Sequence, residues 1–325
     1  MIDKHVKETD RQHTIYEILS ADAKDRDRLI VEYKRRQLEA FAPTTRRNYL
    51  QILKMFRTWC ATQSLDPTPP VSPLTVVAYI DAMAGIIRPT TIETRLWAIS
   101  ELHRSSFLPT PCTHPIVDLA LKSVKRKFGA SIRQAPPLSK REILEAIRKL
   151  GDGRLAIRDK AVLWVASDSW CRASEIVGLK VRDVIPQGDG SSLLHITRSK
   201  TDPYGEGDYA YLSRNGSQAV LAWVKMAGLR PHDPLITKSQ VRATIAPLDP
   251  ATISRIMKRC TGREDVSAHS TRVGGVQDAL QLGCDLSSIM VAGRWTSPEM
   301  PARYGRRLLV SRSAAARVAS AHEAH

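Results

Sequence analysis

The stretch GASIRQAPPLS, from Gly129 to Ser139, constrains the fold more than any other part of the 325-residue chain. It gathers Gly, Pro and Ser between two long regions whose apolar residues recur with a helical period. Such a segment predicts a linker, and the chain is long enough for two domains of ordinary size. Ser139 and Glu142 have the spacing of a capping box, so we expect a helix to open the second domain there.

The first domain is predicted to be an all-helical bundle. Residues 1–25 are polar and charged, and we expect them to form a flexible tail. Residues 26–130 form the helical domain, residues 131–138 the linker and residues 139–325 the second domain. Within TRRNYLQILKMFRTWCATQS, helical spacing predicts one buried face made of Tyr49, Ile52, Leu53, Phe56 and Trp59.

The second domain is predicted to be mostly α, with a small β-hairpin that makes it an α+β domain. LLHIT and YAYL have β-branched and aromatic character, and they flank a turn rich in Pro, Gly and Asp. Helical patterns precede and follow this hairpin. From about Leu308 the chain is Ala-rich and has helical propensity but little to bury by itself, so we expect this helix to dock on a second subunit.

Charge points to a polyanionic partner. The chain has 49 Lys and Arg against 33 Asp and Glu, and the net charge of +16 is spread along the sequence. Nucleic acid is the commonest partner of so basic a protein. We find no run of about 18 apolar residues and no apolar signal segment, so we expect no membrane partner. Five scattered cysteines without a CxxC pair argue for a reducing, cytoplasmic compartment.

Two clusters in the first half of the second domain hold polar residues that packing does not explain. In WCRASEIVGLKV, Arg172 and Glu175 are three residues apart at the start of an amphipathic helix, so they can share a face and pair. Lys200 falls near the tip of the predicted hairpin, which can carry a positive charge into a groove. Taken alone, the first cluster is more simply a surface ion pair, and Lys200 is more simply a solvated residue of the turn.

Two further clusters follow toward the C-terminus. In SAHSTRVGG, His269 and Arg272 project from one side of a helix N-terminus, a favourable place for an anion. In GRWTSPEMPARYGRR, Trp295 precedes Tyr304 by nine residues, and arginines surround the tyrosine. Taken alone, the first is equally a capping cluster, whereas Tyr304 is more simply a partly buried surface residue.

Together the four clusters predict chemistry on a phosphodiester. Two arginine side chains can neutralise its non-bridging oxygens without a metal, and an indole N–H can donate to the same oxygens. Lys200 can protonate a leaving 5′-oxygen, His269 can support proton transfer, and Tyr304 can be the nucleophile. A phosphotyrosine link conserves the bond energy, so rejoining needs no ATP. We find no Walker A motif and no acidic cluster for two Mg²⁺ ions, and therefore expect neither cofactor.

The ordered motifs resemble the tyrosine recombinase (phage integrase) family over the whole chain. CRASEI, HSTRVG and GRWT followed by a tyrosine are similar to the Cre-like branch, in which Trp replaces the His of many other members. The resemblance implies that Tyr304 forms a 3′-phosphotyrosyl link and frees a 5′-hydroxyl group. It also implies that Arg172 and Arg272 clamp the phosphate and that Lys200 is the general acid.

The same resemblance implies supporting roles and an assembly. His269 would assist proton transfer, Trp295 would bind a phosphate oxygen and Glu175 would orient the site. Members resemble C-shaped clamps around double-stranded DNA, and a homotetramer exchanges strands between two inverted-repeat sites through a Holliday junction. The C-terminal helix from about Leu308 would dock in trans on a neighbour. The resemblance also implies a cytoplasmic protein associated with nucleoid or plasmid DNA, of prokaryotic or phage origin.

Ten further basic residues are candidate DNA contacts, mostly to phosphates. They are Arg46, Arg47, Arg88, Arg95, Lys122, Lys125, Arg126, Arg303, Arg306 and Arg307. The last three are equally a solvated helix face. Three other interpretations of the whole chain stay open: a type IB topoisomerase that relaxes DNA as a monomer, a DNA-binding protein with an inactive catalytic site, and an enzyme that resolves telomeres at hairpin ends, for which no motif argues.

Overall fold

The structure is a computed structural model that describes residues 23–131, 134–197, 207–238 and 245–323. The chain divides into two compact units, Met1–Ile132 and Arg133–His325. This division falls inside residues 131–138, the segment predicted as the linker. The predicted tail, residues 1–25, lies outside the described residues except for its last three, which already belong to a helix. Among the described residues, no helix is long and apolar enough to cross a membrane.

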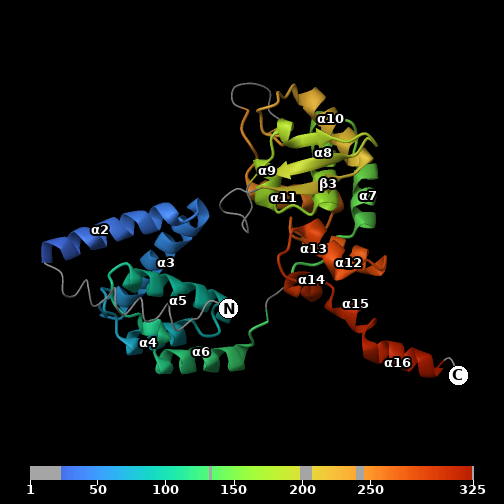
Figure 1. The fold of residues 1–325 in the computed structure, drawn as a ribbon. Helices are drawn as coiled ribbons and strands as arrows, with labels where there is room; N and C mark the ends of the chain where they lie inside the picture. Colours follow the sequence, from blue (N-terminus) through green and yellow to red (C-terminus); the bar gives the residue numbers. More distant parts are fainter. Residues whose placement is uncertain (1–22, 132–133, 198–206, 239–244, 324–325) are drawn as a thin grey trace. The chain divides into compact units, whose positions relative to one another are not determined.

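The first unit is all-helical in its described part, and Figure 1 draws its helices in blue to green. They are α2 (Ala23–Ala40), α3 (Pro43–Thr62), α4 (Pro73–Met83), α5 (Pro89–Arg104) and α6 (Pro115–Phe128), with the 3₁₀ turn η1 (Pro111–Thr113) before α6. Each helix from α3 to α6 has proline in its first turn, where the missing N–H would have no helical partner. The predicted face of α3 is buried except for Trp59, which is partly buried.

The second unit is mostly helical with one small sheet, which confirms the predicted fold class. It comprises α7 (Lys140–Lys149), α8 (Arg154–Ser169), α9 (Ala173–Gly178), the 3₁₀ turn η2 (Val181–Asp183), β1 (Val184–Pro186), β2 (Ser192–Ile196), β3 (Asp208–Leu212), α10 (Arg214–Ala227), α11 (Pro250–Thr261), α12 (Ser270–Gln281), α13 (Leu286–Gly293), α14 (Glu299–Tyr304), α15 (Arg306–Val310) and α16 (Ala314–Glu323). The capping box predicted at Ser139 and Glu142 opens α7.

The described sheet has three antiparallel strands in the order β1-β2-β3. Strands β2 and β3 form the predicted hairpin, with Leu194 opposite Ala210. Strand β1 was not predicted; it pairs Val184 with Leu194 and has only three residues. So short a strand shows no alternation of apolar and polar residues, which is the signal that sequence analysis depends on.

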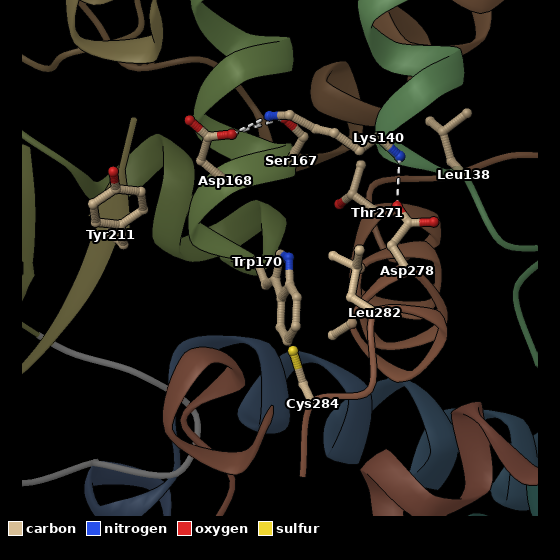
Figure 2. A pocket seen from close by; sticks show the side chains of 12 residues that line it. Leu138, Lys140, Ser167, Asp168, Trp170, Tyr211, Thr271, Asp278, Leu282 and Cys284 are labelled. Atoms are coloured by element: carbon tan, nitrogen blue, oxygen red, sulfur yellow. Dashed lines mark hydrogen bonds and ion pairs between the residues drawn. The ribbon is translucent and has the colours of Figure 1, made fainter. Parts of the chain in front are cut away.

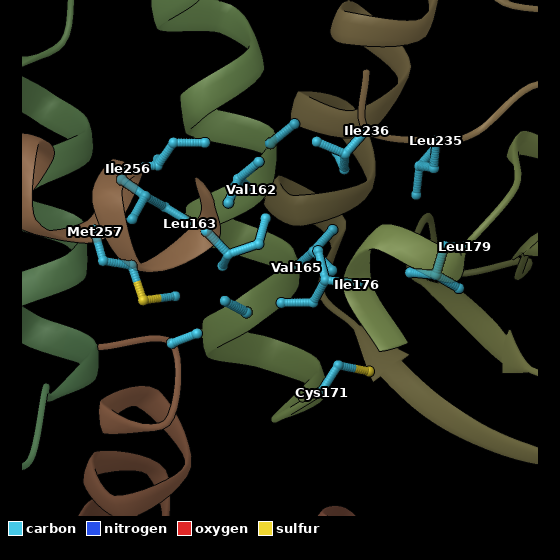
Figure 3. Packing of buried hydrophobic residues seen from close by; sticks show 14 of the residues in the cluster. Val162, Leu163, Val165, Cys171, Ile176, Leu179, Leu235, Ile236, Ile256 and Met257 are labelled. Atoms are coloured by element: carbon cyan, nitrogen blue, oxygen red, sulfur yellow. The ribbon is translucent and has the colours of Figure 1, made fainter. Parts of the chain in front are cut away.

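Helix α8 runs through the core of the second unit, as Figure 3 shows for Val162, Leu163 and Val165. All residues from Ala161 to Val165 are at most 9% exposed, because other elements surround the helix. Its C-cap, Trp170, adopts a left-handed conformation with φ 49° and ψ 30°. This turn directs the chain into Cys171 and Arg172, so a rigid core positions the first predicted site residue.

Candidate active site

Tyr304 is a buried tyrosine whose hydroxyl group contacts a histidine. It ends α14, and only 5% of its surface is exposed because it packs on Val276 and Leu280 of α12. The Nε2 atom of His269 lies 2.6 Å from its hydroxyl oxygen. The interpretation of Tyr304 as a partly buried surface residue is therefore wrong. The other buried residues of its apolar cluster belong to α12 and α13, so they leave no pattern in the sequence around the tyrosine.

Arg272 is buried in the first turn of α12, with 1% of its surface exposed. Its Nη1 atom donates to the carbonyl oxygen of Trp170, and its Nη2 atom donates to that of Gly293 at 2.8 Å. The guanidinium carbon lies 4.5 Å from the ring centroid of Trp295, a cation–π distance. Its Nε atom is one of two buried side-chain nitrogens without a partner among the described residues.

The carboxylate of Glu175 accepts hydrogen bonds from two arginines, Arg172 and Arg294. Its Oε1 atom accepts from Nη1 of Arg172 at 2.6 Å, and its Oε2 atom accepts from the backbone N–H of Arg172 at 2.9 Å. The same Oε2 atom accepts from Nη2 of Arg294 at 2.9 Å. The carboxylate side chain is 1% exposed, so it is held by these bonds alone among the described residues. The predicted pair of Arg172 and Glu175 is therefore part of a larger ionic cluster.

The positive charge of the site and its burial shift the pKa values of its members. Burial, together with the charge of Arg172, lowers the pKa of Arg272 to about 10. Burial and then the charges of both arginines lower the pKa of His269. Burial raises the pKa of Tyr304, although the arginine charges oppose that effect. Although burial opposes ionisation of Glu175, bonds from Arg172 and the charge of Arg294 hold its pKa below the usual value. An anion is the ligand that this excess of cations favours.

Glycines allow two indole rings to enter the site. A Cβ atom at Gly293 would overlap the indole of Trp295, and one at Gly275 would overlap the indole of Trp170. Trp295 lies between Tyr304, at 5.9 Å between ring centroids, and Trp170, at 6.3 Å. The sequence alone predicted no role for the two glycines in STRVGG. The structure shows that Gly275 allows the indole of Trp170 to pack closely on α12.

The structure thus brings together six of the seven predicted residues, namely Arg172, Glu175, His269, Arg272, Trp295 and Tyr304. Lys200, the seventh, lies outside the described residues. Two residues were missed: Trp170, whose carbonyl group and ring support Arg272 and Trp295, and Arg294. Both adopt positive φ angles, and arginine directly before the tryptophan in GRWT was the available signal for the second.

The chain is similar in sequence to two proteins that are recombinases by name. No protein-family model matches the chain. Recombinase Cre of Escherichia phage P1 is 25% identical over 299 residues, which cover 84% of this chain and 87% of Cre. An integrase/recombinase XerD homolog of Selenomonas ruminantium is 26% identical over 311 residues and 88% of each chain. The chain belongs to the tyrosine recombinases. The likeness to Cre agrees with the resemblance of its motifs.

Solved structures with the same fold span most of this tyrosine recombinase. A Tn1549 transposon integrase in complex with circular intermediate DNA superposes with a TM-score of 0.59 and 13% identity, over 85% of this chain and 93% of that one. A lambda integrase dimer bound to a COC′ core site superposes with a TM-score of 0.56 and 14% identity, over 84% of this chain and 94% of that one. At these identities the likeness concerns the fold alone.

The basic residues predicted to contact DNA differ in their surroundings. In the first unit of this recombinase, Arg46, Arg47 and Arg88 are exposed. Arg95 is partly buried and donates to the hydroxyl oxygen of Tyr79 at 3.3 Å, so it also serves the fold.

Both lysines among the ten candidate DNA contacts form ion pairs. Lys122 pairs with Asp118 at 2.6 Å within α6, and Lys125 pairs with Glu93 of α5. Among the other candidates, Arg126, Arg306 and Arg307 are exposed and Arg303 is partly buried.

Trp170 also lines a cavity of about 270 Å³, whose lining side chains are drawn in Figure 2. Its lining is largely apolar and includes Leu138 and Leu282, with Lys140 and Asp168 paired at one side. None of the seven predicted site residues lines it. It is therefore separate from the place where Tyr304 and the arginines meet.

Proposed function

We propose that this chain is a site-specific DNA recombinase that uses Tyr304 to cleave one strand at a time. The observation that carries this proposal is the 2.6 Å contact between His269 and the Tyr304 hydroxyl, beside the buried guanidinium of Arg272. A neutral imidazole can accept a proton, and an adjacent cation stabilises the negative charge that develops on a phosphate. The relatives Cre and the XerD homolog are recombinases by name and match over 84% and 88% of this chain.

In the cleavage step, the Tyr304 oxygen bonds to the scissile phosphorus as its proton passes to Nε2 of His269. The bond from phosphorus to the 5′-oxygen breaks, which leaves a 3′-phosphotyrosyl link and a free 5′-hydroxyl group. We assign the proton for the leaving oxygen to Lys200, on the motif alone. Attack by the 5′-hydroxyl group of another strand reverses these steps and rejoins the DNA.

Arg272 would present its Nε atom to the phosphate. Both of its Nη atoms already donate to backbone carbonyls, which fixes the plane of the guanidinium. A buried donor without a partner costs free energy, and a non-bridging phosphate oxygen would satisfy it. Arg172, whose side chain is 22% exposed, would bind the same phosphate from the more open side.

We propose that the reaction needs neither a metal ion nor ATP. The two arginines and the indole of Trp295 supply the stabilisation of negative charge that a metal would otherwise give. The energy of the broken phosphodiester is kept in the phosphotyrosyl bond, so rejoining requires no other source. This chemistry would take place on DNA in the cytoplasm.

For the assembly, we propose four protomers on a pair of inverted-repeat sites, with strand exchange through a Holliday junction. A structural neighbour with a TM-score of 0.53, the XerH recombinase, is described as bound to a palindromic difH substrate. Helix α16 would dock in trans, because Val318 on it is 58% exposed. The apolar cavity beside Trp170 is our candidate acceptor, and a Val318→Cys variant should then form a disulfide with Cys284 of a second copy under mild oxidation.

The test of the proposed function is covalent trapping. Fragments bound by the protein are selected from source DNA, and a nicked version of the enriched repeat is incubated with the native chain or with Tyr304→Phe in the presence of a chelator. A denaturant-resistant protein–DNA band for the native chain alone supports tyrosine cleavage without a metal. No band on a tightly bound site would favour the DNA-binding protein with an inactive site.

Relaxation by a monomeric type IB topoisomerase is not favoured, because both relatives, matched over 87% and 88% of their own length, are recombinases by name. The two activities separate on a plasmid that carries two target sites. A recombinase exchanges the segments between the sites, whereas a topoisomerase changes only the linking number and also acts on a plasmid without sites.

A further inference from the structure

Arg294 is the buried charged residue of the site to which the cleavage chemistry assigns no task. Its side chain is 4% exposed, and it follows Gly293 and precedes Trp295 in the turn between α13 and α14. Resting on the function proposed above, we infer that Arg294 is a positioning residue that locks this turn to the segment carrying Arg172.

The contacts of Arg294 reach across the site. Its Nη1 atom donates to the carbonyl oxygen of Ser169 at 3.0 Å, and its Nη2 atom donates to Oε2 of Glu175 at 2.9 Å. Nη2 also lies 3.5 Å from Sγ of Cys171. These three partners lie in the segment from the end of α8 to α9, which also contains Arg172. Each of them is more than 100 residues from Arg294 in sequence.

These contacts make Glu175 a bridge between two arginines. One carboxylate oxygen holds the side chain of Arg172, and the other is shared by the backbone of Arg172 and the side chain of Arg294. Removal of Arg294 would leave Oε2 with one donor, and the carboxylate could rotate with the guanidinium that it holds. The position of Arg172 at the phosphate therefore depends on Arg294, which itself touches no reacting atom.

The backbone of Arg294 gives independent support. Its φ of 55° and ψ of 50° lie in the left-handed region, which is unfavourable for a residue with a Cβ atom. Glycine would relieve this strain, so the side-chain bonds must hold the conformation. The turn so fixed also places the carbonyl of Gly293 against Arg272 and the indole of Trp295 over it.

Lysine could not replace these contacts. The guanidinium of Arg294 reaches the Ser169 carbonyl and the Glu175 carboxylate through two nitrogens in a fixed plane. A single ammonium group at the end of a flexible chain has no such geometry. The shape of the Arg294 side chain, and not only its charge, is therefore needed at this position.

The experiment measures single-turnover cleavage of a nicked target by saturating protein, with DNA affinity and thermal unfolding recorded for each variant. Arg294→Gly removes the side chain and relieves the backbone, which favours folding of the variant. We expect cleavage to fall about 100-fold, the scale of a small misplacement of catalytic groups, while affinity for the site stays within about threefold. Arg294→Lys should recover only a small part of the loss.

Guanidinium ions at millimolar, non-denaturing concentration should raise the rate of Arg294→Gly, compared with equal sodium chloride. A residue needed only for folding would give no such rescue. Arg259→Ala is the matched control: Arg259 also binds a buried carboxylate, Asp159, but away from the site, and its loss should leave cleavage unchanged.

Cleavage by Arg294→Gly within threefold of the native rate would overturn the inference. So would a loss of cleavage that parallels a loss of DNA binding and resists guanidinium. A native chain that forms no adduct on a tightly bound site would instead overturn the proposed function, and the inference with it.

Discussion

The Nε2 atom of His269 lies 2.6 Å from the hydroxyl oxygen of Tyr304, although 35 residues separate the two in sequence. Burial lowers the pKa of the histidine, together with the charges of Arg272 and Arg172, and burial raises the pKa of the tyrosine. Both shifts favour a neutral pair at neutral pH, with the proton on the phenol and the imidazole free to accept it. The resting site is thus ready for proton transfer and carries no premature phenolate.

The first prediction concerns the pH dependence of cleavage. Because the pKa of His269 lies below its ordinary value of about 6.5, its base form persists at neutral pH and is lost only on further acidification. The single-turnover rate should therefore be level near neutral pH and fall with a midpoint below about 6.5. His269→Gln should cleave more slowly and lose that midpoint. A native midpoint above the ordinary histidine value would contradict the neutral pair.

The second prediction tests the packing of Trp295 on Gly293. A Cβ atom there would overlap the indole, so Gly293→Ala must displace the ring from Arg272 or shift the turn. We expect a loss of about 1–3 kcal/mol in unfolding free energy, the usual cost of overpacking, and at least about a tenfold loss in cleavage rate. Gly188→Ala is the control, because nothing lies within 4 Å of its added Cβ atom. Equal rates for the two variants would contradict a role for this close contact.

Contacts between distant segments, such as that of Trp295 with Arg272, could not be predicted from the sequence. The linker, the hairpin and the order of the site residues follow from local patterns and motifs, because each depends on neighbours in the chain. The bond from Arg294 to Glu175 joins residues that are 119 apart, and Tyr304 is buried by residues of other helices. Such contacts leave no periodic pattern in the sequence. Trp170 was missed for the same reason, since its contacts with Arg272 and Trp295 exist only after folding.

The third prediction concerns DNA affinity in the first unit. Arg46 and Arg47 are exposed near the start of α3, so they are free of burial constraints on phosphate binding. Replacing both by alanine should weaken DNA binding at low salt and reduce the slope of log K against log salt by about 0.9 for each lost phosphate contact. Thermal unfolding should change little. Arg95→Ala is the comparison: it loses a contact with Tyr79 and should lower stability. An unchanged salt slope for the double variant would remove both arginines from the interface.

The fourth prediction is that acid destabilises the first unit through His103. This side chain is 0% exposed; its Nε2 atom accepts from the N–H of Val71 at 2.9 Å, and its Nδ1 atom lies 2.8 Å from the carbonyl oxygen of Ile99. Burial lowers its pKa, so the folded state binds fewer protons than the unfolded state. The stability from this group is therefore complete above the unfolded value of about 6.5 and is lost below it, at no more than about 1.4 kcal/mol per pH unit. Thermal unfolding of the full chain between pH 7.5 and 5.5 should show a smaller decrease for His103→Gln than for the native protein. His232→Gln, which changes an exposed histidine, should keep the native decrease. Equal decreases for all three proteins would show that His103 does not cause the acid sensitivity.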